Sequence, residues 1–454
     1  MRPQLLNSFQ KQWKSIKNSI SFYASLVAFL FFLFALLIRS LEYTEWAIYY
    51  KEKWSIINTE ENARLILGTL VGGIISLMVF SFSMVMVVIN NASQSLSPRV
   101  VPGIIAHKPH QLVLGTYIGT ILFCLIMVTA VGEAVPKGRS TADLGVMLSL
   151  VLGISCFGLF VYFIHSISQS IQVDAITNRV YERALGKIQQ AIEQNKELPE
   201  KVFDKEKNGE DWKEVYTDTV GYLKNIHLSP LLSWLQEREL KLEVVSRMGD
   251  FTVKGFPYLR VNQKLEKEEV NELQTFFEFY QQEYEHDHYR FDFKQITEIA
   301  LKALSPGIND PRTAVRAVDL LTILFAEHFE IKDCTVYLNE EEKPLIFVRE
   351  PTFEELLYEC VTPIRQYGKE DHLVTGTVLD MLKNLIIVAV DQGHESNLSV
   401  LSKFVSSVSE EVDRSIHNSL DRKKLNRMLE TIERLLNERE GIDPEDYIKL
   451  CIDE

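Results

Sequence analysis

The sequence predicts an α-helical membrane protein with four transmembrane helices, followed by a C-terminal α+β cytosolic region. Four long stretches before residue 170 contain no Lys, Arg, Asp or Glu. Residues 1–171 hold 12 Lys/Arg and 7 Asp/Glu, whereas residues 172–454 hold 36 and 55, so an apolar, slightly basic part precedes an acidic part. Alternating apolar residues and glycine turns after residue 213 are typical of short strands.

Each apolar stretch is long enough to cross the hydrocarbon core of a bilayer, which takes roughly 20 helical residues. The first stretch has the basic start of a signal peptide, but Arg39-Ser40-Leu41-Glu42 after it is not a small-residue cleavage site, so we interpret it as a retained anchor. The four predicted spans are Ile20–Ile38, Leu65–Ile89, Leu112–Val131 and Leu144–Ile167.

The distribution of basic residues predicts the orientation, because loops rich in Lys and Arg stay in the cytosol. The N-terminal tail carries four basic residues and no acidic one, and Arg179, Arg183 and Lys187 follow the fourth span. Four basic residues between the first two spans weaken this argument. We expect a multi-pass protein of the cell membrane with both termini in the cytosol.

The second predicted span carries a stripe of small and polar residues, which steps of four and seven place near one face of a helix. Two interpretations are compatible. Small residues let helices pack closely, as in the GxxxG patterns at Gly68 and Gly115, or hydroxyl and amide groups line a pore. The stripe, our set of pore-lining or helix-packing candidates, consists of Gly68, Gly72, Ser76, Ser83, Asn90 and Gln94.

The C-terminal region divides by composition. Residues 1–171 form the transmembrane domain, 172–213 a connecting helix and linker, 214–262 a small β-rich subdomain and 263–454 a mainly helical domain. Within the last, Phe293–Leu304 reads as a helix and 333–350 as a β-hairpin. The turn Ser305–Pro311 predicts an N-cap at Asp310 and a first helical residue at Pro311, with a helix following over Arg312–Glu327.

Several functions are disfavoured. No P-loop, GxGxxG, nucleophile elbow or HExxH pattern occurs, so we predict no enzyme and no catalytic residue. The acidic C-terminal part disfavours nucleic acid. Five scattered cysteines make neither a disulfide framework nor a zinc site. His286 and His288 lack further identifiable ligands, so we predict no metal and no cofactor. Uncharged spans disfavour a proton-coupled carrier.

Motifs in several parts of the chain resemble a bacterial family of predicted membrane proteins, domain of unknown function 2254. The resemblance implies a bacterial cell-membrane protein without an assigned activity, and it directs attention to polar residues of these motifs. The motifs are Ser95-Leu-Ser-Pro-Arg99, Gln111-Leu-Val-Leu-Gly115-Thr-Tyr-Ile-Gly119-Thr, Tyr162-Phe-Ile-His165, Ser170-Ile-Gln-Val-Asp174 and Ala303-Leu-Ser-Pro-Gly-Ile-Asn-Asp-Pro311 with Thr313-Ala-Val315.

The expected function is an oligomeric channel or pore-like protein, lined by the second span and assembled or gated by the cytosolic region. A membrane-anchored sensor or scaffold is the alternative, and a small-solute transporter is the third. The expected partners are the lipid bilayer and further copies of the chain, with the ligand unidentified. The cytosolic motif candidates are Arg99, Gln172, Asp174, Asn309, Asp310 and Arg312.

Overall fold

The computed structural model describes residues 22–41, 59–95, 108–131, 143–170, 173–196, 212–281, 288–339, 341 and 343–437. The chain divides into two compact units, residues 1–175 and 176–454. Long helices dominate the described parts, and strands occur in the second unit. Several sequence predictions, including the motif candidates Arg99 and Gln172, fall outside the described residues.

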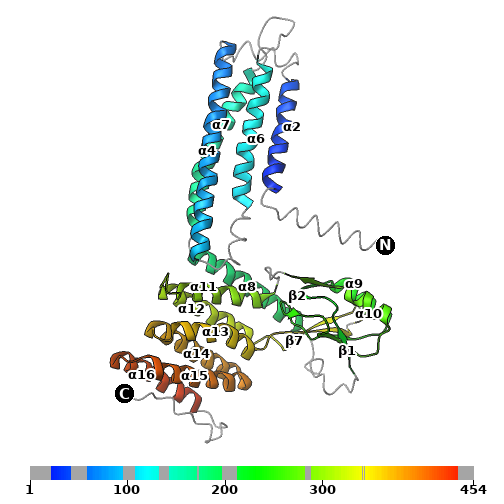
Figure 1. The fold of residues 1–454 in the computed structure, drawn as a ribbon, viewed down its shortest axis with the longest axis vertical. Helices are drawn as coiled ribbons and strands as arrows, with labels where there is room; N and C mark the ends of the chain where they lie inside the picture. Colours follow the sequence, from blue (N-terminus) through cyan, green and yellow to red (C-terminus); the bar gives the residue numbers. More distant parts are fainter. Residues whose placement is uncertain are drawn as a thin grey trace. The chain divides into compact units, whose positions relative to one another are not determined.

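The four long helices described in the first unit lie side by side (Figure 1). They are α2 (Phe22–Leu41), α4 (Glu60–Ser95), α6 (Lys108–Ala130) and α7 (Asp143–Ser170), one for each predicted span. Their outer surface is strongly apolar, with Leu65, Ile154 and Val161 exposed at 67%, 70% and 69%. Because water-soluble proteins rarely expose large continuous apolar patches, this surface is suited to lipid.

Among the described residues, five helices are long and apolar enough to cross a membrane, one more than the four predicted spans. The fifth is α14 (His372–Gln392), which lies within the region 263–454 that the sequence predicts to be a mainly helical domain. In the second unit, α14 packs against α12, α13, α15 and α16. Val374, Leu382 and Ile386 on α14 are fully buried by these neighbours. An apolar core helix therefore passes the same length and composition criteria as a span.

The strands of the second unit form two small sheets. One has the order β1 (Lys213–Tyr216), β5 (Pro257–Val261), β3 (Leu242–Val244), β8 (Pro344–Arg349) and β7 (Cys334–Leu338). The other has the order β4 (Phe251–Thr252), β2 (Gly221–Ile226) and β6 (Phe277–Tyr280). The predicted hairpin at 333–350 is confirmed as β7 and β8. The parallel pairing of β3 with β8 joins this hairpin to the strands of residues 214–262.

Helices make up the rest of this unit, and α11 to α16 stack in succession in Figure 1. Alongside α8 (Val173–Asn195) they comprise α11 (Tyr289–Ala303), α12 (Pro311–His328), α13 (Phe353–Gly368), α14, α15 (Glu395–Ser415) and α16 (Ser419–Asn437). The short helices α9 (Leu228–Glu237) and α10 (Lys267–Gln274) accompany the strands. One large apolar cluster joins α8 to α11–α16.

The predicted corner between α11 and α12 is confirmed. Asp310 is the N-cap of α12, its side chain accepts hydrogen bonds from the Thr313 backbone N–H and hydroxyl, and Pro311 occupies the first turn. The preceding helix begins earlier than predicted, at Tyr289, because His288 caps it by accepting from the Arg290 backbone N–H.

Candidate functional site

The stripe on α4 lies on the side of the helix opposite its packed face. Ala63, Leu67, Ile74, Ser81 and Val88 are buried within the four-helix bundle. At 100° per residue, the stripe residues fall about half a turn away from them. The described stripe side chains, Gly68, Gly72, Ser76, Ser83 and Asn90, are all exposed. No described residue covers this face.

The two GxxxG patterns have different surroundings. A Cβ on Gly115 of α6 would lie 2.8 Å from the Ala24 backbone, and one on Gly119 would lie 2.6 Å from Phe31. Both glycines therefore allow α2 to pack closely on α6. A Cβ on Gly68 or Gly72 would meet nothing within 4 Å. Close packing inside the chain is thus shown for α6, whereas the pattern on α4 is open.

The α4 face also contains apolar side chains. Val79 and Met86, exposed at 56% and 52%, lie on the same side as the stripe. The Ser76 hydroxyl donates to the Gly72 carbonyl 3.0 Å away, so its hydrogen is used within the helix. Polar character is therefore concentrated at Ser83 and Asn90 in the second half of α4.

The structure describes only part of the motif set. Arg99 and Gln172 lie outside the described residues, and only the backbone of Gln94, in α4, is described. Asp174 is exposed in the first turn of α8. Asn309, Asp310 and Arg312 lie together on the exposed corner before and at the start of α12.

Backbone hydrogen bonds hold this corner in one conformation. Asn309 has a left-handed φ of 50°, which asparagine tolerates better than most residues. The backbone N–H of Asn309 donates to the backbone carbonyl of Ser305. The backbone N–H of Asp310 donates to the backbone carbonyl of Ala303 at 2.8 Å. The Ser305 hydroxyl donates to the backbone carbonyl of Lys302 at 2.6 Å. The corner therefore presents ordered, exposed polar groups.

A buried polar cluster that the sequence pattern did not predict lies where β8 ends and α11 begins. Glu350 accepts hydrogen bonds from His288 at 2.9 Å, Tyr289 at 2.8 Å and Thr335 at 2.6 Å. The Tyr289 hydroxyl also lies 3.4 Å from Nε2 of the buried His328. Three donors on one carboxylate tie α11 to strands β7 and β8.

Burial and hydrogen bonding give His328 and Glu350 in this cluster different charge states. Burial lowers the pKa of His328 to about 4, so its imidazole is neutral near pH 7. Burial alone would raise the pKa of Glu350, but hydrogen bonds and the interaction with His288 hold it below its ordinary value. Glu350 is therefore the charged member, and its donors stabilise that charge.

The next residues of α11 make further buried ion pairs. Arg290 is 6% exposed and contacts Asp250 at 2.7 Å and Glu359 at 3.1 Å. Asp292 is fully buried and accepts from Arg183 at 2.7 Å and Lys187 at 2.9 Å, both on α8. The only sequence signal was the dense alternation of charged and aromatic residues at 285–292, which does not reveal distant partners.

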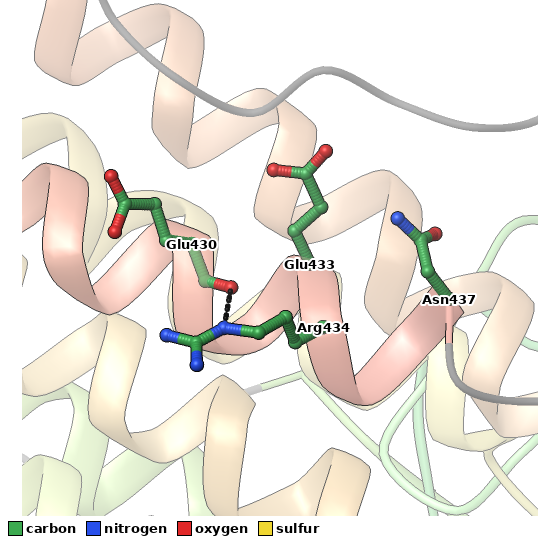
Figure 2. Close-up of a pocket in the computed structure, with 4 residues that line it drawn as sticks. All are labelled: Glu430, Glu433, Arg434 and Asn437. Carbon is green, nitrogen blue, oxygen red and sulfur yellow. Dashed lines mark hydrogen bonds between the residues drawn. The ribbon is translucent and has the colours of Figure 1, made fainter.

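A surface pocket lies along α16, where Glu430, Glu433, Arg434 and Asn437 line it (Figure 2). The Arg434 Nε donates to the Glu430 backbone carbonyl at 3.3 Å. The lining residues all come from one helix, so the pocket gathers no groups from separate parts of the chain. Across the described ranges, no group of three or more His, Cys, Asp or Glu residues is arranged to hold a metal ion.

A family model matches most of this chain. The family described as Predicted membrane protein (DUF2254) matches residues 17–384. The chain belongs to this family. The match spans the four long helices of the first unit and continues into α14. It therefore covers the stripe, the α11–α12 corner and the buried cluster, and leaves out α15 and α16.

The curated relatives that this DUF2254 chain matches are named as uncharacterised proteins. It is 24% identical over 357 residues to Uncharacterized protein MT1328 of Mycobacterium tuberculosis (strain CDC 1551 / Oshkosh), which covers 75% of this chain and 67% of that protein. The same values hold for Uncharacterized protein Mb1321c of Mycobacterium bovis (strain ATCC BAA-935 / AF2122/97). No solved structure matches. The comparisons thus identify a membrane protein of unknown function.

Proposed function

We propose that this protein is an oligomeric channel or pore-like protein of the cell membrane, in which α4 from several copies lines the conducting path. The observation that carries the proposal is the open face of α4, where Gly68, Gly72, Ser83 and Asn90 point away from their own bundle. Open glycines allow close approach of a second copy. Exposed hydroxyl and amide groups favour contact with water over lipid.

The proposal includes a topology. Four helices, α2, α4, α6 and α7, cross the bilayer, both termini are cytosolic, and the second unit assembles or gates the pore from the cytosol. The apolar outer surface of the bundle supports four spans, whereas α14 buries its apolar residues against its own neighbours. The basic residues at the N-terminus and after α7 support the orientation.

The test is conductance of the purified full-length protein in planar bilayers. We expect unitary currents that Ser83→Leu and Asn90→Leu reduce, because leucine removes the polar group and narrows the path. Phe82→Leu is the matched control, since Phe82 is exposed on α4 about a quarter turn away from the stripe. Absence of currents at all voltages and tensions, or a monomer in mild detergent, would contradict the channel.

A membrane-anchored sensor or scaffold is the second candidate, favoured by the exposed and ordered corner at Asn309, Asp310 and Arg312. In this case the corner binds a ligand or partner and the spans anchor the chain. Affinity capture with full-length protein and with its Arg312→Ala variant tests it. A partner that the variant loses while α12 stays folded would favour the sensor.

A further inference from the structure

Two neighbouring connections between the strands of the second unit expose a group of apolar side chains. The segment between β1 and β2 lies beside the turn between β4 and β5, because the Gly255 N–H donates to the Thr217 carbonyl at 2.8 Å. Five apolar side chains in and next to these connections, which we call the apolar tip, are 40–53% exposed. They are Tyr216, Val220, Phe251, Val253 and Phe256.

The apolar tip reverses the usual polarity of a half-buried strand, which turns apolar side chains inward and polar ones outward. Phe251 and Val253 are half exposed, whereas Thr252 between them is buried. The Thr252 hydroxyl donates to the Gly221 backbone carbonyl at 3.2 Å, so this hydroxyl keeps a hydrogen bond in the interior. Tyr216 is exposed and Thr217 after it is buried, so two separate segments show the same reversal.

The tip cannot simply turn its side chains into the core. Leu223 on β2 and Leu259 on β5 are fully buried and already occupy the inward positions of these strands. Because protein interiors are close-packed, further large side chains do not fit without displacing those present. An ordered apolar patch on a protein surface typically marks a contact with a partner or with a membrane.

We propose that the apolar tip docks on the lipid bilayer, with its side chains at the level of the headgroups and the upper acyl chains. Aromatic rings are enriched at this depth, and shallow insertion of apolar side chains holds peripheral segments on membranes. Lys254 in the tip pairs with Asp218 at 3.6 Å, so this pair adds no net charge. Apolar contact therefore drives the docking, and zwitterionic lipid is sufficient.

The tether and the area of the tip favour a bilayer over a second copy of the chain. Only residues 171 and 172 separate α7 from α8, so at most about 11 Å of chain joins α8 to an apolar helix. A tethered surface is present at a high effective concentration, so a small patch suffices. Five half-exposed side chains offer about 400–500 Å², against the roughly 800 Å² that each partner of a stable protein interface buries. The inference rests on the proposed position of α7 in the bilayer, but not on conductance.

Quenching of a fluorescent label by lipid tests the docking. The full chain with Cys451→Ser receives one new cysteine, and its other four cysteines are buried. Each protein is labelled with nitrobenzoxadiazole and reconstituted into phosphatidylcholine vesicles with and without a nitroxide-bearing phospholipid. We expect the label on Val253→Cys to be quenched by the nitroxide lipid. Val161→Cys, exposed on α7, is the positive control, and Leu420→Cys, exposed near the start of α16, is the negative control.

Substitutions in the tip supply the second arm, with the label on Val220→Cys. Phe251→Ser should reduce quenching by the nitroxide lipid, because it removes an exposed ring from the tip. Ile323→Ser is the matched control, since it removes an exposed apolar side chain from α12. It should leave the quenching unchanged. Val253→Ser serves as a second tip variant if Phe251→Ser does not fold.

Four results would overturn the proposal. Quenching at position 161 without quenching at position 253 would refute the docking and leave the proposed span in place. Absence of quenching at position 161 would refute the span on which the docking rests. Equal quenching at positions 253 and 420 would show that no defined tip contacts the lipid. Quenching at position 253 by nitroxide-labelled second copies, and not by lipid, would show that another copy covers the tip.

Discussion

Single buried charges in the second unit are held by partners from distant parts of the chain. Asp292 is fully buried, and both of its oxygens accept from cations of α8. Removing one partner of a buried ion pair leaves the others uncompensated, which is more damaging than the net value of the pair suggests. The effect of a substitution at Asp292 thus depends on burial rather than on charge alone.

We predict that Asp292→Asn lowers the free energy of unfolding by roughly 3–5 kcal/mol, because the fully buried position loses the charged carboxylate that accepts from Arg183 and Lys187. Asp380→Asn is the control, because Asp380 is half exposed where it pairs with Lys383. This substitution should lower the free energy of unfolding by only about 0–1 kcal/mol. Denaturant unfolding, followed through the fluorescence of the buried Trp234, measures both. Equal small effects would contradict the buried-pair argument.

The His328–Glu350 cluster predicts acid sensitivity. Burial holds the pKa of His328 at about 4 against an ordinary 6.5, so the unfolded chain takes up a proton below pH 6.5 that the native state refuses. The pKa of Glu350 is also held low, so its stabilising contribution is present above its ordinary pKa and lost as the pH falls. Both groups destabilise the unit on acidification.

Unfolding free energy should therefore fall between about pH 6.5 and pH 4, and His328→Gln should flatten the fall in this window. Urea titrations at half-unit pH intervals, with Trp234 as reporter, measure the slope. An unchanged slope in the variant would assign the acid sensitivity to other groups.

Pairs of helices show how the same small-residue pattern serves two purposes. On α6, Gly115 lies against the α2 backbone, whereas Gly68 and Gly72 on α4 face open space. A glycine pattern marks a surface that admits close approach, but it does not say which helix approaches. The structure assigns one pattern to the fold and leaves the other open among the described residues.

We predict that Gly115→Val disrupts the bundle and lowers its thermal midpoint, because the new side chain collides with the backbone at Ala24. Gly68→Val should leave the bundle folded and reduce the fraction of oligomer. Thermal unfolding and size-exclusion chromatography with light scattering separate the two effects. An unaltered oligomer in Gly68→Val would remove α4 from the proposed interface.

The whole molecule combines two kinds of apolar helix. Those of the first unit expose large apolar side chains, and α14 hides its own within the second unit. Length and hydropathy do not separate these cases, because both environments favour uninterrupted apolar residues.

Residues 176–454 form a compact unit, and we predict that this fragment expressed alone stays in the supernatant after cell disruption and ultracentrifugation without detergent. The full chain should pellet with the membranes and leave them only in detergent. A fragment that pellets and requires detergent would make α14 a fifth span.

The sequence by itself determined the apolar first part, the positions of the four long helices in it, the corner capped by Asp310 and the family. Each of these follows from local chemistry: a run of uncharged residues, a proline after a capping aspartate, or a motif. Only the tertiary structure decided that α14 is covered by its neighbours, that α4 turns its small residues outward, and that Glu350 and Asp292 find distant partners. Those facts depend on which surfaces meet, and contacts between residues a hundred positions apart leave no periodic trace along the chain.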